Sequence, residues 1–152
     1  MNDALLETWR IHQRIHLFML EAIDEEQLKA SWEKGRSVGE HLHHIVKVRR
    51  MWLKQAAPEW LGEPKDDDSK VSVTKAALQT ALADSADRIE RLLELGLETG
   101  RIKGFRPHPT AFLGYLIAHE AHHRGQIALL LRQAGVPLDK KTAYGMWEWG
   151  VR

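Results

Sequence analysis

Apolar residues recur at intervals of three and four along four long stretches of this chain, and no stretch alternates with the two-residue period of a half-buried strand. The pattern predicts helices over about Asp3–Ile23, from Ser37 to about Ala57, over about Thr74–Glu98, and from about Thr110 to Gly135. Four helices of roughly twenty residues are typical of a bundle. Because 152 residues is the length of one domain, we expect a single all-α four-helix bundle over residues 1–152, ending in a short aromatic tail.

Local signals mark the ends of these helices and the loops between them. Ser37 and Glu40 have the spacing of a capping box, and Gly135 followed by Pro137 is typical of a helix C-terminus. We expect surface loops at 58–72 and 99–109, which are rich in glycine and proline. The acidic run Asp66–Asp68 lacks the spaced oxygen ligands of a calcium loop, so it predicts a solvated loop. Trp147 and Trp149 of the tail should cover an apolar surface of this subunit or of a partner, and we favour packing over the end of the bundle.

Composition excludes several classes of function. The chain has no cysteine, so disulfides, thiolate metal sites and a cysteine nucleophile are excluded. Its 22 basic and 21 acidic side chains are interspersed, which argues against a nucleic-acid partner. No apolar run is long enough to span a membrane and no leader is evident, so we expect no membrane partner and a cytoplasmic location. We expect a small-molecule substrate, and leave a homodimer open.

Two histidines four residues apart, His119 and His123, lie on one face of the last predicted helix, inside its apolar stripe. Imidazoles one helical turn apart can bind the same metal ion. Glu120 also lies in the stripe, Gln126 lies near its border, and His122 lies just beyond its edge, so we leave His122 out of the ligand set. The alternative is a pair of core histidines that are hydrogen-bonded to the backbone or to Glu120.

A third ligand has to come from another helix, and the second predicted helix offers His41, His43 and His44. Helical periodicity places His41 within the inward arc, His44 at its flank and His43 on the polar side, which slightly favours His41. A second pair at spacing four, His12 and His16, shares the inward stripe of the first helix. This pair could line a substrate cavity, with His12 favoured as a pocket residue, supply a general base, bind a second metal, or form interhelical hydrogen bonds.

Two segments together resemble a known family. Ser37-Val-Gly-Glu-His-Leu-His-His44-Ile-Val-Lys-Val-Arg49-Arg-Met-Trp52-Leu and His119-Glu-Ala-His-His123-Arg-Gly-Gln126-Ile are similar to the two signatures of the DinB/YfiT-like metalloenzyme superfamily. The resemblance implies a four-helix bundle that binds a divalent metal, typically zinc or nickel, through His44, His119 and His123. His41 remains the alternative ligand from the second helix.

Three neutral imidazoles would leave a fourth coordination position open, as in catalytic metal sites. Some members of the superfamily use a low-molecular-weight thiol in S-transferase reactions, so the resemblance implies a thiol-dependent S-transferase in detoxification or stress response. The alternatives are a metal-dependent hydrolase that uses activated water and a non-catalytic, metal-stabilised binding bundle. Glu120 or Gln126 could orient a metal-bound ligand from outside the coordination shell. For Glu120, a buried bond to Arg124 or to another helix is an equal alternative.

Overall fold

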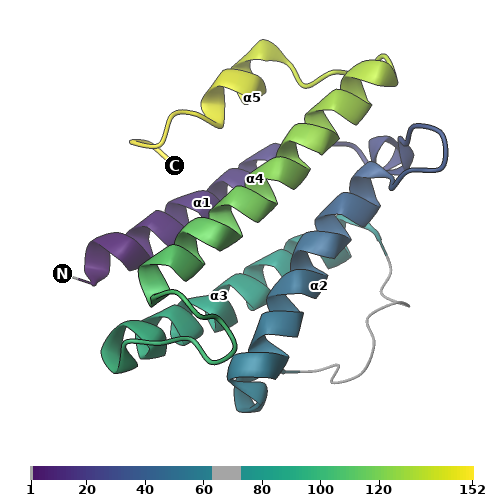
Figure 1. The fold of residues 1–152 in the computed structure, drawn as a ribbon. Coiled ribbons are helices and arrows are strands. Elements are labelled where there is room, and N and C mark those ends of the chain that lie inside the picture. The colour runs from purple at the N-terminus through teal and green to yellow at the C-terminus, as the bar shows by residue number, and fades with distance from the viewer. Residues whose placement is uncertain (1, 63–72) are drawn as a thin grey trace.

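Helices make up almost all of the regular structure in the computed structural model, which describes residues 2–62 and 73–152. Within these residues, the four long helices are α1 (Asp3–Glu21), α2 (Val38–Ala56), α3 (Lys75–Thr99) and α4 (Pro109–Gln133). Figure 1 shows α1 and α2 on opposite sides of the bundle, and each of them packs against both α3 and α4. The predicted all-α four-helix bundle is therefore confirmed. Each predicted helix end lies within two residues of the observed one.

The helix ends follow from the local sequence. The Ser37 side chain accepts the Glu40 N–H at 3.1 Å, and the Glu40 carboxylate accepts the Ser37 N–H at 2.7 Å, so the predicted capping box is present. After α4, Gly135 adopts a φ of 79° that favours glycine. This turn lets the Val136 N–H reach the Leu131 carbonyl at 2.9 Å and satisfy one of the last carbonyls of the helix.

Three short helices were not predicted from the sequence: η1 (Glu26–Lys29), η2 (Pro58–Trp60) and α5 (Lys140–Gly145). The loop before α4 is not wholly superficial, because Ile102 is buried in the core. The acidic run at 66–68 lies outside the described residues. No helix in the described ranges has the length and apolar character needed to cross a membrane.

The C-terminal tail differs from the prediction. α5 lies beside α1 and the second half of α4 (Figure 1), but Trp147 is 80% exposed and Trp149 is only half-buried. The prediction that both tryptophans pack over the bundle end is wrong for Trp147. The tail docks instead through smaller contacts: Thr142 and Gly145 are buried, and the Arg152 guanidinium lies 3.8 Å from the centre of the Phe18 ring.

The core consists of two apolar clusters with a polar layer between them. One cluster includes Trp9, Leu53, Ile89 and Phe112, and the other includes Met19, Leu42, Leu82 and Ile127. On each long helix, buried polar residues come between the residues of the two clusters in the sequence: His12, Gln13 and His16 on α1, Arg49 on α2, Ser85 on α3, and Glu120 on α4.

Arg49 lies at the centre of this layer and is completely buried. Its Nε donates to Glu120 Oε2 at 3.0 Å, and its Nη2 donates to Glu120 Oε1 at 2.5 Å and to Gln13 Oε1 at 2.9 Å. Its Nη1 donates to the Leu82 carbonyl at 3.0 Å and to Ser85 Oγ at 3.1 Å. These bonds use all five N–H groups of the guanidinium. One side chain of α2 therefore binds α1, α3 and α4 at once.

Arg49→Met should lower the free energy of unfolding by about 3–5 kcal/mol, because it leaves the Glu120 carboxylate buried without its main counter-charge. Urea denaturation measures this change, with Arg91→Met on the exposed side of α3 as the control, where we expect less than about 0.5 kcal/mol. The double variant Arg49→Met/Glu120→Gln should lose less than the sum of the single losses. Strictly additive losses would contradict the proposed pairing.

Candidate metal centre

Three histidines from two helices converge at the interface of α2 and α4. One ring nitrogen from each of His44, His119 and His123 lies within 4.8 Å of the other two. The Nε2 atoms of His119 and His123 are 3.2 Å apart. Two zinc–nitrogen bonds of about 2.0–2.1 Å at a tetrahedral angle would place their nitrogens about 3.3 Å apart. The spacing of this pair is therefore close to that of two ligands on one tetrahedral ion.

His41 lies behind this group. Its Nδ1 is 2.9 Å from Nδ1 of His123, on the side of the His123 ring opposite to the nitrogen that faces His119. The structure brings together His44, rather than the alternative His41, with His119 and His123. His41 is instead placed to orient the His123 ring through a hydrogen bond, a common arrangement around metal-binding histidines.

Electrostatics favour the neutral, metal-binding form of all three imidazoles. Burial, followed by the positive charge of Arg36, lowers the pKa of His44 to about 4. Burial, followed by the neighbouring His119 and His44, lowers the pKa of His123 to about 3. Burial also lowers the pKa of His119. The lone pairs are therefore available at neutral pH, and the donor set fits a divalent metal that accepts nitrogen ligands, such as zinc or nickel.

The centre adjoins an open recess. His44 lines a hollow of about 380 Å³ together with Lys34, Gly35, Arg36, Glu40, His43 and Lys47. His44 and His119 are half-buried, whereas His123 is buried. Of the three histidines, His44 is therefore the one that a small molecule in the recess would contact.

Comparison with known proteins identifies the family and the fold. The family model described as "DinB family" matches residues 1–148. The chain belongs to the DinB family. A crystal structure of a DinB-like protein from Bacillus cereus is similar over 89% of this chain and 93% of that chain, with a TM-score of 0.70 and 26% sequence identity. No curated protein matches the chain.

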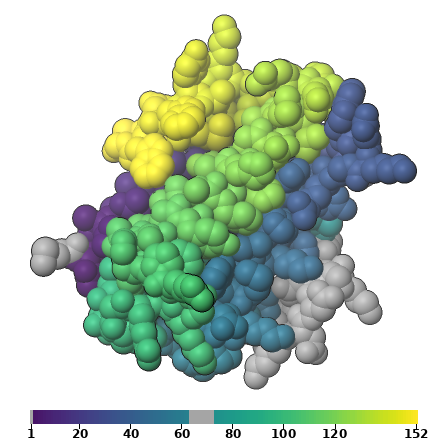
Figure 2. Space-filling view, in the orientation of Figure 1, coloured from purple at the N-terminus to yellow at the C-terminus, as the bar shows by residue number. Residues whose placement is uncertain are grey.

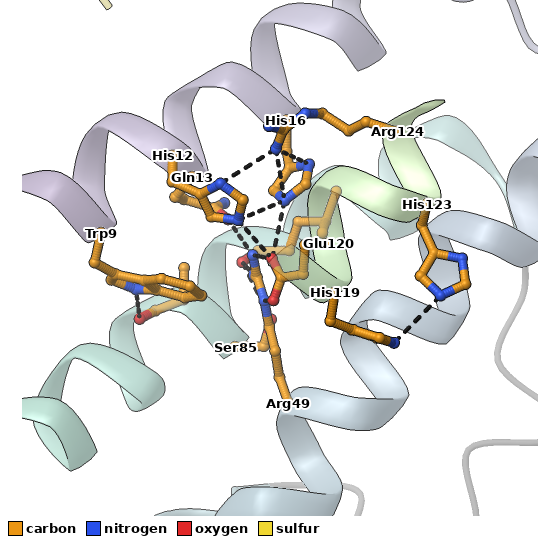
Figure 3. A network of polar contacts seen from close by, with 12 residues as sticks. Trp9, His12, Gln13, His16, Arg49, Ser85, His119, Glu120, His123 and Arg124 are labelled. Carbon is orange, nitrogen blue, oxygen red and sulfur yellow. Dashed lines mark hydrogen bonds and ion pairs between the residues drawn. The ribbon is translucent and has the colours of Figure 1, made fainter. Parts of the chain in front are cut away.

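In this DinB-family protein, Glu120 points away from the three histidines although it follows His119 directly. Its Oε1 accepts hydrogen bonds from His12 Nε2 at 3.1 Å and from His16 Nε2 at 2.9 Å, in addition to those from Arg49 (Figure 3). Burial alone would raise the pKa of Glu120, but the charge of Arg49 and these hydrogen bonds hold it well below its usual range. Glu120 is therefore an ionised member of the polar layer, which matches the alternative of a buried bond to another helix.

His12 and His16 are fully buried in the same layer, so the structure places His12 in the core rather than at the wall of the open recess. Nη1 of Arg124 is 3.2 Å from His12 Nδ1 and 3.5 Å from both ring nitrogens of His16. Because arginine can only donate and an ionised carboxylate can only accept, His12 Nδ1 accepts from Arg124 and the ring proton of His12 lies on the Nε2 atom that faces Glu120. Burial lowers the pKa of His12, and that of His16 well below the ordinary value, so both rings are neutral.

One possible ligand atom from each of His12, His16 and Glu120 also lies within 4.8 Å of the other two, so these residues are a second candidate metal-binding group. Two observations favour the hydrogen-bonded arrangement instead. The guanidiniums of Arg49 and Arg124 both contact the group and would repel a divalent cation. In addition, the Glu120 carboxylate already contacts both histidine rings and accepts two hydrogen bonds from Arg49. We interpret this pair as interhelical hydrogen-bonding histidines.

Two other residues from the sequence lie near the centre without joining it. Gln126 is half-buried one turn beyond His123, and among the described residues no hydrogen bond joins it to the three histidines. Its proposed role in orienting a ligand stays a prediction. His122 is exposed and is not part of the group, as its position beyond the stripe indicates.

Sequence reasoning missed Arg49 as a key residue. A signal was present, because Arg49 follows Leu42, Ile45 and Val46 at the helical spacing of the apolar stripe of α2. An arginine inside such a stripe requires a buried acidic partner. Glu120, which lies in the stripe of α4, is that partner.

Metal content should separate the roles of His41 and His44. In purified variants reconstituted with zinc or nickel, His44→Ala, His119→Ala and His123→Ala should each lose stoichiometric metal. His41→Ala should keep the metal but bind it about 10- to 100-fold more weakly, because only the orientation of His123 is disturbed. His122→Ala is the matched control on α4 and should bind like the wild type. Full metal in His44→Ala with none in His41→Ala would show that His41 is the ligand.

The stability of the metal-free protein should fall as the pH drops below about 6.5. In the described part of the chain, burial lowers the pKa of six histidines: His12, His16, His41, His44, His119 and His123. The unfolded chain takes up protons near 6.5, whereas the folded chain resists them to lower pH, so acid favours unfolding.

Denaturant titrations between pH 8 and pH 4 measure the slope, which is at most about 1.4 kcal/mol per pH unit for each proton taken up. His44→Gln should show a shallower slope than the wild type, whereas the exposed control His122→Gln should not. Equal slopes in wild type and His44→Gln would contradict the lowered pKa of His44.

Proposed function

We propose that this DinB-family protein is a divalent-metal-dependent enzyme that transfers a low-molecular-weight thiol to an electrophilic small molecule. The observation that carries the proposal is the convergence of His44, His119 and His123 on one point beside an open recess. A divalent metal held by these histidines would supply a Lewis acid that lowers the pKa of a thiol or water that it binds. Three protein ligands are typical of catalytic sites, whereas structural zinc sites usually have four.

The surroundings favour a thiol over water as the nucleophile. A hydrolase benefits from a carboxylate base next to the attacking water. The ligand group here contains no carboxylate, and its neighbour Glu120 is ionised but bonded into the polar layer by Arg49, His12 and His16. Glu40 lines the recess, but its carboxylate accepts the Ser37 N–H. A thiol, with an ordinary pKa near 8.5, needs less help from a base than water does.

The residues of the chain have distinct tasks in this proposal. The three histidines stay neutral and hold the metal, and His41 orients the ring of His123. Glu120 and Arg49 fix the rotation of α4 and so the positions of His119 and His123. In the reaction, a bond forms between the thiol sulfur and the electrophilic carbon, the bond from that carbon to its leaving group breaks, and the thiol proton passes to solvent.

Turnover assays test the proposal. The zinc- or nickel-loaded protein should accelerate the reaction of cysteine or 2-mercaptoethanol with 1-chloro-2,4-dinitrobenzene, measured by thioether formation. The acceleration should disappear after chelation and in His44→Ala, and should persist in His122→Ala. Hydrolysis of p-nitrophenyl esters without thiol, at a metal-dependent rate, would instead identify a hydrolase. Metal binding that raises the melting temperature without either activity would favour a non-catalytic bundle.

A further inference from the structure

Most of the charged side chains that line the recess beside His44 are basic. Lys34, Arg36 and Lys47 line it with three positive charges, and Glu40 is its single acidic residue. The Glu40 carboxylate is already occupied by the capping box at 2.7 Å from the Ser37 nitrogen. Among the described residues, no carboxylate lies within 4.0 Å of the charged nitrogens of the three basic side chains. Among the described residues that line the recess, the three positive charges therefore outnumber the single negative charge of Glu40.

The basic side chains of the recess come from two segments of the chain. Lys47 and His43 lie one turn apart on the face of α2 that also carries His44. Lys34 and Arg36 come from the loop before α2, which is closed by a hydrogen bond from the Gly35 N–H to the Trp32 carbonyl at 3.0 Å. The Val38 N–H donates to the Ala30 carbonyl at 2.9 Å and fixes the far end of the loop. In Figure 2 this loop stands out in dark blue beside α2 and the end of α4.

Two further observations connect the recess to the metal centre. His44, one of the three candidate ligands, itself lines the recess together with Arg36. His43 also lines the recess, and its buried Nε2 atom has no hydrogen-bond partner among the described residues.

We propose that this recess binds an oxyanion, a carboxylate or a phosphate, of the thiol or electrophile that reacts at the adjacent histidines. The assignment to a reacting molecule rests on the function proposed above, whereas the anion site itself does not. Arg36 and Lys47 bind the oxyanion, and His43 forms part of the wall of the same recess. The reacting sulfur or carbon then lies toward His44, so the recess selects acidic over neutral molecules.

Thiols of different charge test the selectivity. In the cobalt-loaded protein, absorption changes report the binding of 3-mercaptopropionate and of its neutral counterpart 2-mercaptoethanol. The wild type should prefer 3-mercaptopropionate, and Arg36→Gln and Lys47→Gln should each reduce that preference by about fivefold. Lys54→Gln is the matched control, since Lys54 is exposed on the same helix and does not line the recess. Its preference should equal that of the wild type.

Titration of the metal-free protein tests the anion site by itself. Succinate and inorganic phosphate, added separately at constant ionic strength, should shift the backbone amide NMR signals of residues 34–47. The anion that binds with the higher affinity in these titrations identifies the kind of oxyanion. The shifts should weaken in Arg36→Gln and persist in Lys54→Gln. If these shifts occur but cobalt or thiols do not bind, the proposed function fails and the anion site stands. Absent shifts, with equal thiol preference in all variants, would overturn the anion site.

Discussion

The buried pair of Arg49 and Glu120 is the interaction on which the rest of this bundle depends. A charged guanidinium in an apolar core is tolerated only when its hydrogen bonds are complete. Here Gln13, Leu82, Ser85 and Glu120 complete them, and the Trp9 ring lies 4.9 Å from the guanidinium carbon as an additional cation–π contact. These partners come from all three other long helices, so the apolar clusters on either side can pack in only one relative arrangement without leaving a buried charge unpaired.

The polar layer and the metal centre lie on two faces of the same helix, α4. His119 and His123 face His44 of α2, whereas Glu120 and Arg124 face the histidines of α1 (Figure 3). Consecutive residues of a helix differ by about 100° in direction, so the two sites are fixed with respect to each other by the helix backbone. The polar layer therefore fixes the orientation of His119 and His123 without belonging to the candidate metal centre.

The sequence predicts the fold and much of the site because both depend on local pattern. Helical periodicity, the Ser37 capping box and Gly135 determine the long helices, and the spacing of His119 and His123 is set by one turn of helix. The choice between His41 and His44 depends on how α2 and α4 cross, which periodicity does not contain. Likewise, the partners of Arg49 and the exposure of Trp147 depend on packing between segments far apart in the sequence. These points depend on three-dimensional contacts and not on the local pattern.

The sharing of α4 by two sites limits how its length can change during evolution. Inserting or deleting one residue between Leu116 and His119 would rotate everything after it by about 100°. Such a change would turn Glu120 away from Arg49 and the histidines away from His44 in one step, so the core and the site would fail together. Length variation is therefore expected at the ends of α4, in the loop at 100–108 and beyond Gly135, and not within the helix. Indels among related chains should be concentrated there.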